Sequence, residues 1–168
     1  MRLFWDYLGL CFFKNNPLDL EPSTSFVWRC IAFYLASGTI VEANISDPAD
    51  GSLEVAMRAI VAVTLIVSMV LVLKKWPRFL QLLTAIFMCE NFIMTLGIGA
   101  EILDYFLQRT PYEQVSLYIG GALILWYMAI LAYILRQMFE YNNTASLIMA
   151  FAYFALTYGG PFLVMEVI

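Results

Sequence analysis

Five long apolar stretches, separated by short polar connectors, limit what this chain can fold into more than any other feature of its sequence. A transmembrane α-helix needs about 20 predominantly apolar residues to cross a hydrocarbon core of about 30 Å. A soluble domain carries about 25% charged residues, whereas this chain of 168 residues carries 13%, and 62% of its residues are apolar. A soluble fold this small cannot bury that much apolar surface. The sequence therefore predicts an all-α fold, a polytopic membrane helical bundle.

The chain divides into two predicted parts. Residues 1–23 form an N-terminal interfacial helix followed by a cytosolic, proline-rich linker, and residues 24–168 form a five-span transmembrane bundle. Turn-forming residues mark the connectors between the spans. Segment 157–161 (Thr-Tyr-Gly-Gly-Pro) should bend or locally unwind the last span, because proline lacks the backbone donor that a helix needs. The predicted spans cover approximately residues 26–43, 53–73, 79–107, 115–135 and 145–167.

The first apolar segment is too short to cross a bilayer. Residues 1–13 place apolar side chains at roughly helical spacing, with Arg2 and Lys14 flanking them. This pattern indicates a helix that lies along the bilayer surface; the alternative is a frayed apolar tail. No small-residue cleavage site follows, so we expect the segment to be retained rather than removed as a signal peptide. The linker after it is a candidate cytosolic docking segment, represented by Pro17, Asp19, Leu20 and Pro22.

Basic residues set the predicted orientation, because cytoplasmic connectors carry an excess of Lys and Arg. With the N-terminus inside, six of the nine Lys and Arg residues lie on the cytosolic side, while the opposite side holds only Arg109. The sequence thus predicts a bacterial inner-membrane protein with a cytoplasmic N-terminus and a periplasmic C-terminus. The six cytosolic basic residues are Arg2, Lys14, Lys74, Lys75, Arg78 and Arg136.

Polar residues at membrane depth are the candidate functional residues, since each is costly at the bilayer centre and is rarely kept without a partner. The third span carries polar and small residues at spacings of three or four positions, which places them on one face of a helix. We expect this intramembrane polar stripe to face protein or a water-filled crevice rather than lipid. Its members are Glu90, Met94, Gly97, Glu101, Asp104 and Gln108.

Two interpretations of Glu90 stay open at this point. Glu90 lies twelve residues beyond Arg78, about 18 Å along the helix axis and therefore near mid-membrane. It is either protonated and hydrogen-bonded to a neighbouring helix or subunit, or it binds a cation, a proton or another ligand. Asn91 faces another direction and is expected to tie a second helix by a side-chain hydrogen bond.

Arginines inside the spans need acidic partners or a path to the headgroups. Arg58 lies at a depth similar to that of Glu101 and Asp104, so we expect an ion pair with this acidic cluster, with Glu42 as a further candidate partner. Such an interhelical pair would hold the bundle together. Arg29 lies one turn inside the cytosolic face, and its side chain either extends to the headgroups or leans toward the mid-membrane glutamate.

Small residues in the last three spans are expected to allow close approach between helices. The predicted packing glycines are Gly97, Gly99, Gly120, Gly121, Gly159 and Gly160.

The residue types present exclude most enzyme chemistry. Histidine is absent, which removes His-ligated haem, HExxH-type metal sites and Ser–His or Cys–His nucleophiles. The three cysteines form neither a metal motif nor a disulfide framework. Segment 97–101 only approaches the Gly-x-Gly-Asp element of intramembrane aspartyl proteases, and no basic tract supports nucleic-acid binding. We expect no enzymatic activity, no cofactor, no metal site and no nucleic-acid partner.

Residues 16–23 (Asn-Pro-Leu-Asp-Leu-Glu-Pro-Ser) lie between the apolar N-terminal segment and the first span. This stretch resembles a Pro-x-Asp-Leu-x-Pro-Ser-like element found at the same place in small proteobacterial inner-membrane proteins. The five-span layout, with a cytosolic N-terminus and short connectors, is also similar to the Yip1-like superfamily. The resemblance implies a non-enzymatic bundle that acts through partners, and it supplies no catalytic residues.

Three functional hypotheses follow. The first is a non-enzymatic integral membrane subunit or scaffold that contacts itself, as a homo-oligomer, or another membrane protein within the lipid bilayer. The alternative is a small transporter, channel or lipid-binding component that uses Glu90 as a protonatable intramembrane site. A more remote option is a subunit of a respiratory or biosynthetic membrane enzyme whose cofactors lie in other chains.

Overall fold

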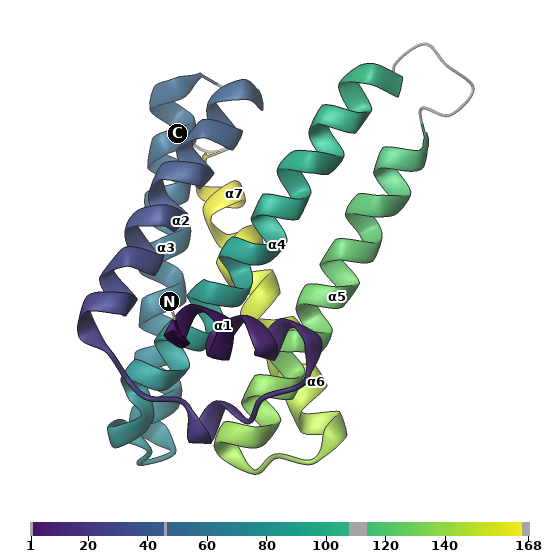
Figure 1. Ribbon diagram of the computed structural model, residues 1–168. Coiled ribbons are helices and arrows are strands. Elements are labelled where there is room, and N and C mark those ends of the chain that lie inside the picture. The colour runs from purple at the N-terminus through teal and green to yellow at the C-terminus, as the bar shows by residue number, and fades with distance from the viewer. Residues whose placement is uncertain (1, 46, 108–113, 166–168) are drawn as a thin grey trace.

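The computed structural model describes residues 2–45, 47–107 and 114–165, and no strand occurs among them (Figure 1). The fold is therefore all-α, as the sequence predicts. The elements in chain order are α1 Arg2–Leu8, η1 Gly9–Phe12, η2 Pro17–Asp19, α2 Thr24–Ile45, α3 Pro48–Val72, η3 Trp76–Arg78, α4 Phe79–Leu107, α5 Gln114–Phe139, α6 Asn143–Phe154, η4 Ala155–Gly159 and α7 Gly160–Met165.

Five helical segments are long and apolar enough to cross a membrane, judged by length and composition. They lie close to the five spans that the sequence predicts, because the same apolar runs and polar breaks define both. The five segments are Thr24–Glu42, Pro48–Val72, Trp76–Leu107, Gln114–Phe139 and Asn143–Met165.

Local capping explains where two of these helices begin. α3 begins at Pro48, earlier than predicted, because the Asp47 side chain accepts a hydrogen bond from the backbone N–H of Ala49 at 2.9 Å and proline is tolerated in the first helical turn. α6 begins after Asn142, whose side chain caps it. The last segment is interrupted by η4, a π-helical turn directly before α7 and Pro161, at the place where the Gly-Gly-Pro sequence predicts local unwinding.

The bundle is closed in one half and open in the other. Ten consecutive residues of α4, Leu82–Asn91, are buried, because the N-terminal segment, α2 and α5 pack around this half of α4. Beyond Asn91 the side chains of α4 are half-buried or exposed. Figure 1 shows α4 and α5 running side by side and leaning away from α2 and α3 toward the end where they are connected.

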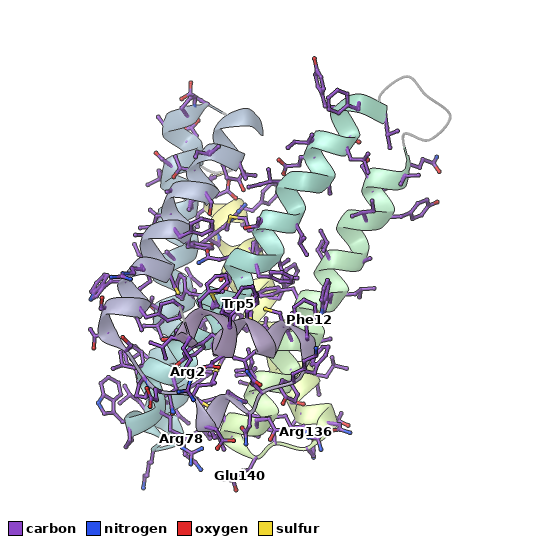
Figure 2. The ribbon with its side chains drawn as sticks, viewed as in Figure 1. Arg2, Trp5, Phe12, Arg78, Arg136 and Glu140 are labelled. Atoms are coloured by element: carbon purple, nitrogen blue, oxygen red, sulfur yellow. The ribbon has the colours of Figure 1, made fainter. Side chains whose placement is uncertain are left out.

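Polar contacts link helices and connectors in the closed half. Asn91 Nδ2 on α4 donates a hydrogen bond to the backbone carbonyl of Cys30 on α2 at 2.9 Å, which confirms that this side chain ties a second helix. Lys75 Nζ lies 3.1 Å from Glu140 Oε1 and links the α3–α4 connector to the α5–α6 connector. Arg78 and Arg136 lie at the same end as Glu140 (Figure 2); we call it the basic end of the bundle.

The glycine that permits close helix packing is one that the sequence did not single out. A Cβ at Gly38 would lie 2.8 Å from Cγ1 of Val55, so α2 and α3 approach closely here. A Cβ on any of the six predicted packing glycines would meet no described atom within 4 Å. The prediction that these glycines bring helices together is therefore wrong for contacts among the described residues, because the glycines lie where the helices diverge or on their outer faces.

The N-terminal segment is folded into the bundle. Tyr7 and Cys11 have no exposed surface, and the segment crosses α4 and α5 (Figure 1). The indole Nε1 of Trp126 donates to the Cys11 carbonyl at 3.0 Å, and the Tyr133 hydroxyl donates to the Asn15 carbonyl at 3.0 Å. The alternative of a frayed tail is thus wrong, and the inner apolar face of the helix is covered by protein rather than by the bilayer.

The outer face of the same segment is also apolar. Phe4 and Trp5 expose 42% and 65% of their surface, and Figure 2 labels Trp5 on this segment. Burial raises the pKa of Tyr7 to about 12, so its hydroxyl keeps its proton and donates to the Glu21 carbonyl at 3.1 Å. The segment therefore has one apolar face toward the bundle and another available to lipid headgroups and chains.

The candidate docking segment is only partly accessible. Pro17 and Leu20 are buried, and Gln81 Nε2 on α4 donates to the Leu20 carbonyl at 2.6 Å. Asp19 and Pro22 are exposed. Pro17 and Leu20 are therefore not accessible for docking, because they attach the N-terminal segment to this chain's own bundle, while docking through Asp19 and Pro22 stays a prediction.

We expect Gly38→Val to weaken the contact between α2 and α3. The added side chain would press on Val55, and overpacking of this kind costs about 1–3 kcal/mol, so thermal unfolding in mild detergent should have a lower midpoint. Gly121→Ala is the control: a Cβ there meets no described atom within 4 Å, so this variant should unfold no earlier than the wild type. An unchanged midpoint for Gly38→Val would contradict the close approach.

Candidate functional site

A cavity of about 580 Å³ lies in the open half, lined by residues of α2, α3, α4, α5, α6 and the π-helical turn η4. Its volume falls within the range of about 300–1,000 Å³ that is typical of small-molecule sites. The cavity exists because α4 and α5 diverge from α2 and α3 beyond Asn91, while η4 packs against α3. The open half of the bundle thus has room for a bound molecule.

The polar stripe forms one wall of this cavity. Glu90 lies where α4 leaves the closed half, and the stripe continues along α4 toward the α4–α5 connection. Their helical spacing places these residues on one face of α4, and in the open half this face borders the cavity. In the closed half, by contrast, neighbouring helices cover the other faces of α4 as well. The residues of the stripe that line the cavity are Glu90, Met94, Gly97, Glu101 and Asp104; Gln108 lies outside the described residues.

Glu90 is the most buried acid of the cavity, with 2% of its surface exposed. Its Oε1 accepts a hydrogen bond from the Tyr158 hydroxyl at 2.6 Å. Its Oε2 and the hydroxyl of Tyr127 are buried and make no hydrogen bond of normal geometry among the described residues, although the hydroxyls of Tyr34 and Tyr127 lie beside the carboxyl group. An unsatisfied buried polar group costs about 1–3 kcal/mol, so a molecule that supplies a partner here would bind favourably.

Tyr158 connects Glu90 to the arginine of α3. The π-helical turn widens the helix at this point, as such turns frequently do at functional sites, and Tyr158 lies within it. Its hydroxyl contacts Glu90, and the guanidinium of Arg58 lies over its ring, 5.1 Å from the centroid. A cation over an aromatic face is attracted by the ring quadrupole, so the two interactions together fix the position of Tyr158.

Arg58 is held by two carboxylates at the cavity wall. Its Nη1 lies 2.6 Å from Oε1 of Glu42 on α2, and its Nη2 lies 2.5 Å from Oε1 of Glu54 on α3. The three side chains are 13–18% exposed. Charge-assisted hydrogen bonds of this geometry are about twice as strong as neutral ones. The pairing therefore joins α2 to α3 beyond the close contact at Gly38.

The ion pairs of Arg58 confirm the predicted partner Glu42 and differ from the prediction at the acids of α4. Among the residues described, the ion pairs of Arg58 are with Glu42 and Glu54, not with Glu101 or Asp104, because the divergence of α4 takes its acids away from α3. Asp104 instead accepts a hydrogen bond from Ser116 on α5. Arg29 is exposed and does not line the cavity, so it does not lean toward the mid-membrane glutamate.

Sequence reasoning missed four residues of the site. Glu54 precedes Arg58 by one helical turn, and this i, i+4 spacing is a signal that was available. Tyr34, Tyr127 and Tyr158 come from α2, α5 and η4 and meet at the cavity. From the sequence, a tyrosine in an apolar span can equally well be a packing residue. Only the fold shows that these three tyrosines lie around the carboxylate of Glu90.

The described residues limit which chemical groups the site can contribute. Among residues 2–45, 47–107 and 114–165, no group of three or more His, Cys, Asp or Glu side chains is arranged to hold a metal ion. The three cysteines are buried and free. What the cavity offers is an apolar volume with a carboxylate, aromatic hydroxyls and an ion-pair cluster in its walls.

We expect Arg58→Met to destabilise the protein by up to about 3 kcal/mol, since it removes the guanidinium that two poorly solvated carboxylates contact. The triple variant Arg58→Met, Glu42→Gln, Glu54→Gln should recover most of the loss. Lys75→Met, which breaks the exposed pair with Glu140, is the control and should change stability by less than about 1 kcal/mol. Thermal unfolding in detergent measures all three, and equal effects of Arg58→Met and Lys75→Met would contradict the role of the cluster.

Comparisons of the chain with protein-family models, with curated proteins and with solved structures found no match. The resemblance to small proteobacterial inner-membrane proteins and to the Yip1-like superfamily therefore stays a prediction. The function has to be argued from the cavity itself.

Proposed function

We propose that this chain is an integral protein of a bacterial inner membrane, with a cytoplasmic N-terminus and a periplasmic C-terminus. The five apolar segments support membrane insertion, and the basic end supports the orientation. Exposed aromatic rings also fit two interfaces: Trp76 is 53% exposed at the basic end, and Tyr105 and Tyr118 are exposed at the other. In this orientation the cavity belongs to the periplasmic half, and α1 lies nearer the cytoplasmic side.

We further propose that the protein is a non-enzymatic binding component, of a transport or lipid-handling kind, that holds a small amphipathic molecule in the cavity. One observation carries this proposal: Glu90 is buried at the base of the cavity with one carboxylate oxygen that makes no hydrogen bond of normal geometry in the described part of the chain. A polar group in such a place is costly without a partner. A bound molecule would supply the partner and cover the apolar walls.

The scaffold hypothesis is the second candidate, and a different observation favours it. Gly99 on α4 and Gly121 on α5 are exposed, and a Cβ on either would meet no described atom within 4 Å. Outward-facing glycines allow a helix of another chain to approach closely in lipid. The polar stripe, however, faces the cavity rather than this outer surface, so the buried acid is explained better by a ligand than by a subunit contact.

We expect the wild-type protein purified in mild detergent to carry a small molecule. In the Glu90→Gln variant, the fraction of protein that carries this molecule should be lower. Glutamine keeps the size of the side chain and an oxygen that can accept from Tyr158, so the fold should persist while the charged anchor is lost. Native mass spectrometry of the intact protein, with identification of the released compounds, measures the occupancy.

Glu140→Gln is the control for this experiment, because it removes a carboxylate from an exposed ion pair at the basic end. Occupancy should match that of the wild type. A stoichiometric protein partner that Glu90→Gln releases, with no bound small molecule in the wild type, would overturn the binding proposal in favour of the scaffold.

The orientation is tested with cysteines placed at the two ends. In a background where Cys11, Cys30 and Cys89 are replaced by Ala, we expect Glu140→Cys to react with a membrane-impermeant maleimide only from the cytoplasmic side. Tyr118→Cys should react only from the periplasmic side. The unsubstituted background gives the blank, and the reverse labelling pattern would show that the orientation is inverted.

A further inference from the structure

We propose that the molecule bound in the cavity is a lipophilic organic cation: one ammonium-like charge that contacts Glu90 and an apolar body that fills the rest of the volume. This inference rests on the proposed binding function and names the class of ligand. Three properties of the cavity carry it: its balance of charges, its aromatic residues and its apolar walls.

The balance of charges favours a cation. Within the described part of the chain, the acidic residues that line the cavity are Glu42, Glu90, Glu101 and Asp104, and Arg58 is the basic residue that lines it. The charge of Arg58 is already compensated by two carboxylates at 2.5–2.6 Å. Glu90 and Glu101 are acids of the same cavity beyond this cluster, and in a medium of low dielectric constant a carboxylate attracts a cation strongly.

An anionic ligand meets the opposite situation. To reach Arg58 it would have to displace Glu42 or Glu54 from a short charge-assisted hydrogen bond. Along α4 it would then face the carboxyl groups of Glu101 and Asp104. The same argument applies to a lipid phosphate, so the cavity suits a simple organic cation better than a phospholipid headgroup.

Aromatic rings surround the carboxylate. Tyr34, Tyr127 and Tyr158 line the cavity with Glu90, and the rings of Tyr127 and Tyr158 have centroids 6.4 Å apart at 80° to each other. Recognition of quaternary ammonium groups characteristically uses such aromatic surroundings. Tyr158 already has the guanidinium of Arg58 over its ring, so one aromatic ring of this group holds a cation within the protein.

The remaining wall suits an apolar body. Val41, Val55, Ile93, Leu117, Leu123 and Ile124 line the cavity together with the charged residues. Gly97 on α4 and Gly120 on α5 also line the cavity and add no side chain. A Cβ on either glycine would meet no described atom within 4 Å, so these glycines do not bring helices together. They leave room in the cavity that a bulky ligand can occupy.

The test uses two ions of nearly the same shape and opposite charge. Binding of tetraphenylphosphonium and of tetraphenylborate is measured by equilibrium dialysis on the full-length protein in lipid nanodiscs, with protein-free nanodiscs as the blank for partition into lipid. Benzyltrimethylammonium serves as a smaller cation, in case the larger probe does not enter. The proteins compared are the wild type, Glu90→Gln and the control Glu140→Gln.

We expect saturable binding of a cation by the wild type and by Glu140→Gln, weaker by about tenfold in Glu90→Gln, and no saturable binding of tetraphenylborate. Comparable binding of the anion, or cation binding that Glu90→Gln leaves unchanged, would overturn the assignment of the ligand class. So would the absence of binding by both cations. If the purified wild type then still carries a small molecule that depends on Glu90, the binding function stands without the cation; if it carries none, the binding function fails as well.

Discussion

A guanidinium held away from bulk water needs carboxylates beside it. In the open half of this bundle, the contacts that satisfy the guanidinium of Arg58 determine how the helices are placed. Glu42 comes from α2 and Glu54 from α3, so satisfying one charge joins two helices. The ring of Tyr158 lies beneath the same guanidinium, which brings the interrupted C-terminal helix against α3. With its hydroxyl directed to Glu90, Tyr158 completes a chain of contacts from the α2–α3 pair to α4. The cavity walls on this side are thus set by electrostatics together with the close contact between Gly38 and Val55.

The closed half is held together mainly by apolar packing. Leu82–Asn91 of α4 is covered on all sides, and the side chain of Asn91 is bonded to a backbone carbonyl of α2. Apolar contact and the buried hydrogen bond of Asn91 join the helices there, and the N-terminal segment adds a further layer. Because the helices are fastened at one end and kept apart at the other, a molecule can occupy the open half without disturbing the packing of the closed half.

Much of the architecture could be predicted from the sequence, since apolar runs, prolines and capping residues act locally. The helical period likewise predicted that Glu90, Glu101 and Asp104 share one face of α4, and in the structure this face lines the cavity. The partners of Arg58 could not be predicted with the same certainty, because a partner four residues away and one on another helix satisfy a charge equally well. The docking of the N-terminal segment had no local signal at all: it depends on donors from Trp126 and Tyr133, more than one hundred residues along the chain. The glycines were misjudged because a small side chain permits both a close contact and an empty space, and only the fold decides between them.

The attachment of the N-terminus to α5 has a consequence for how the protein is made. The segment leaves the ribosome before α5, the helix that carries its hydrogen-bond donors, so its place in the bundle does not exist until α5 has been synthesised. Until then the apolar side chains of α1 and η1, and the backbone carbonyls that α5 will bond, must be sheltered by lipid, water or a chaperone. The packing of the N-terminal segment against the bundle is therefore a late event in biogenesis. It can take place only after α4 and α5 have assembled.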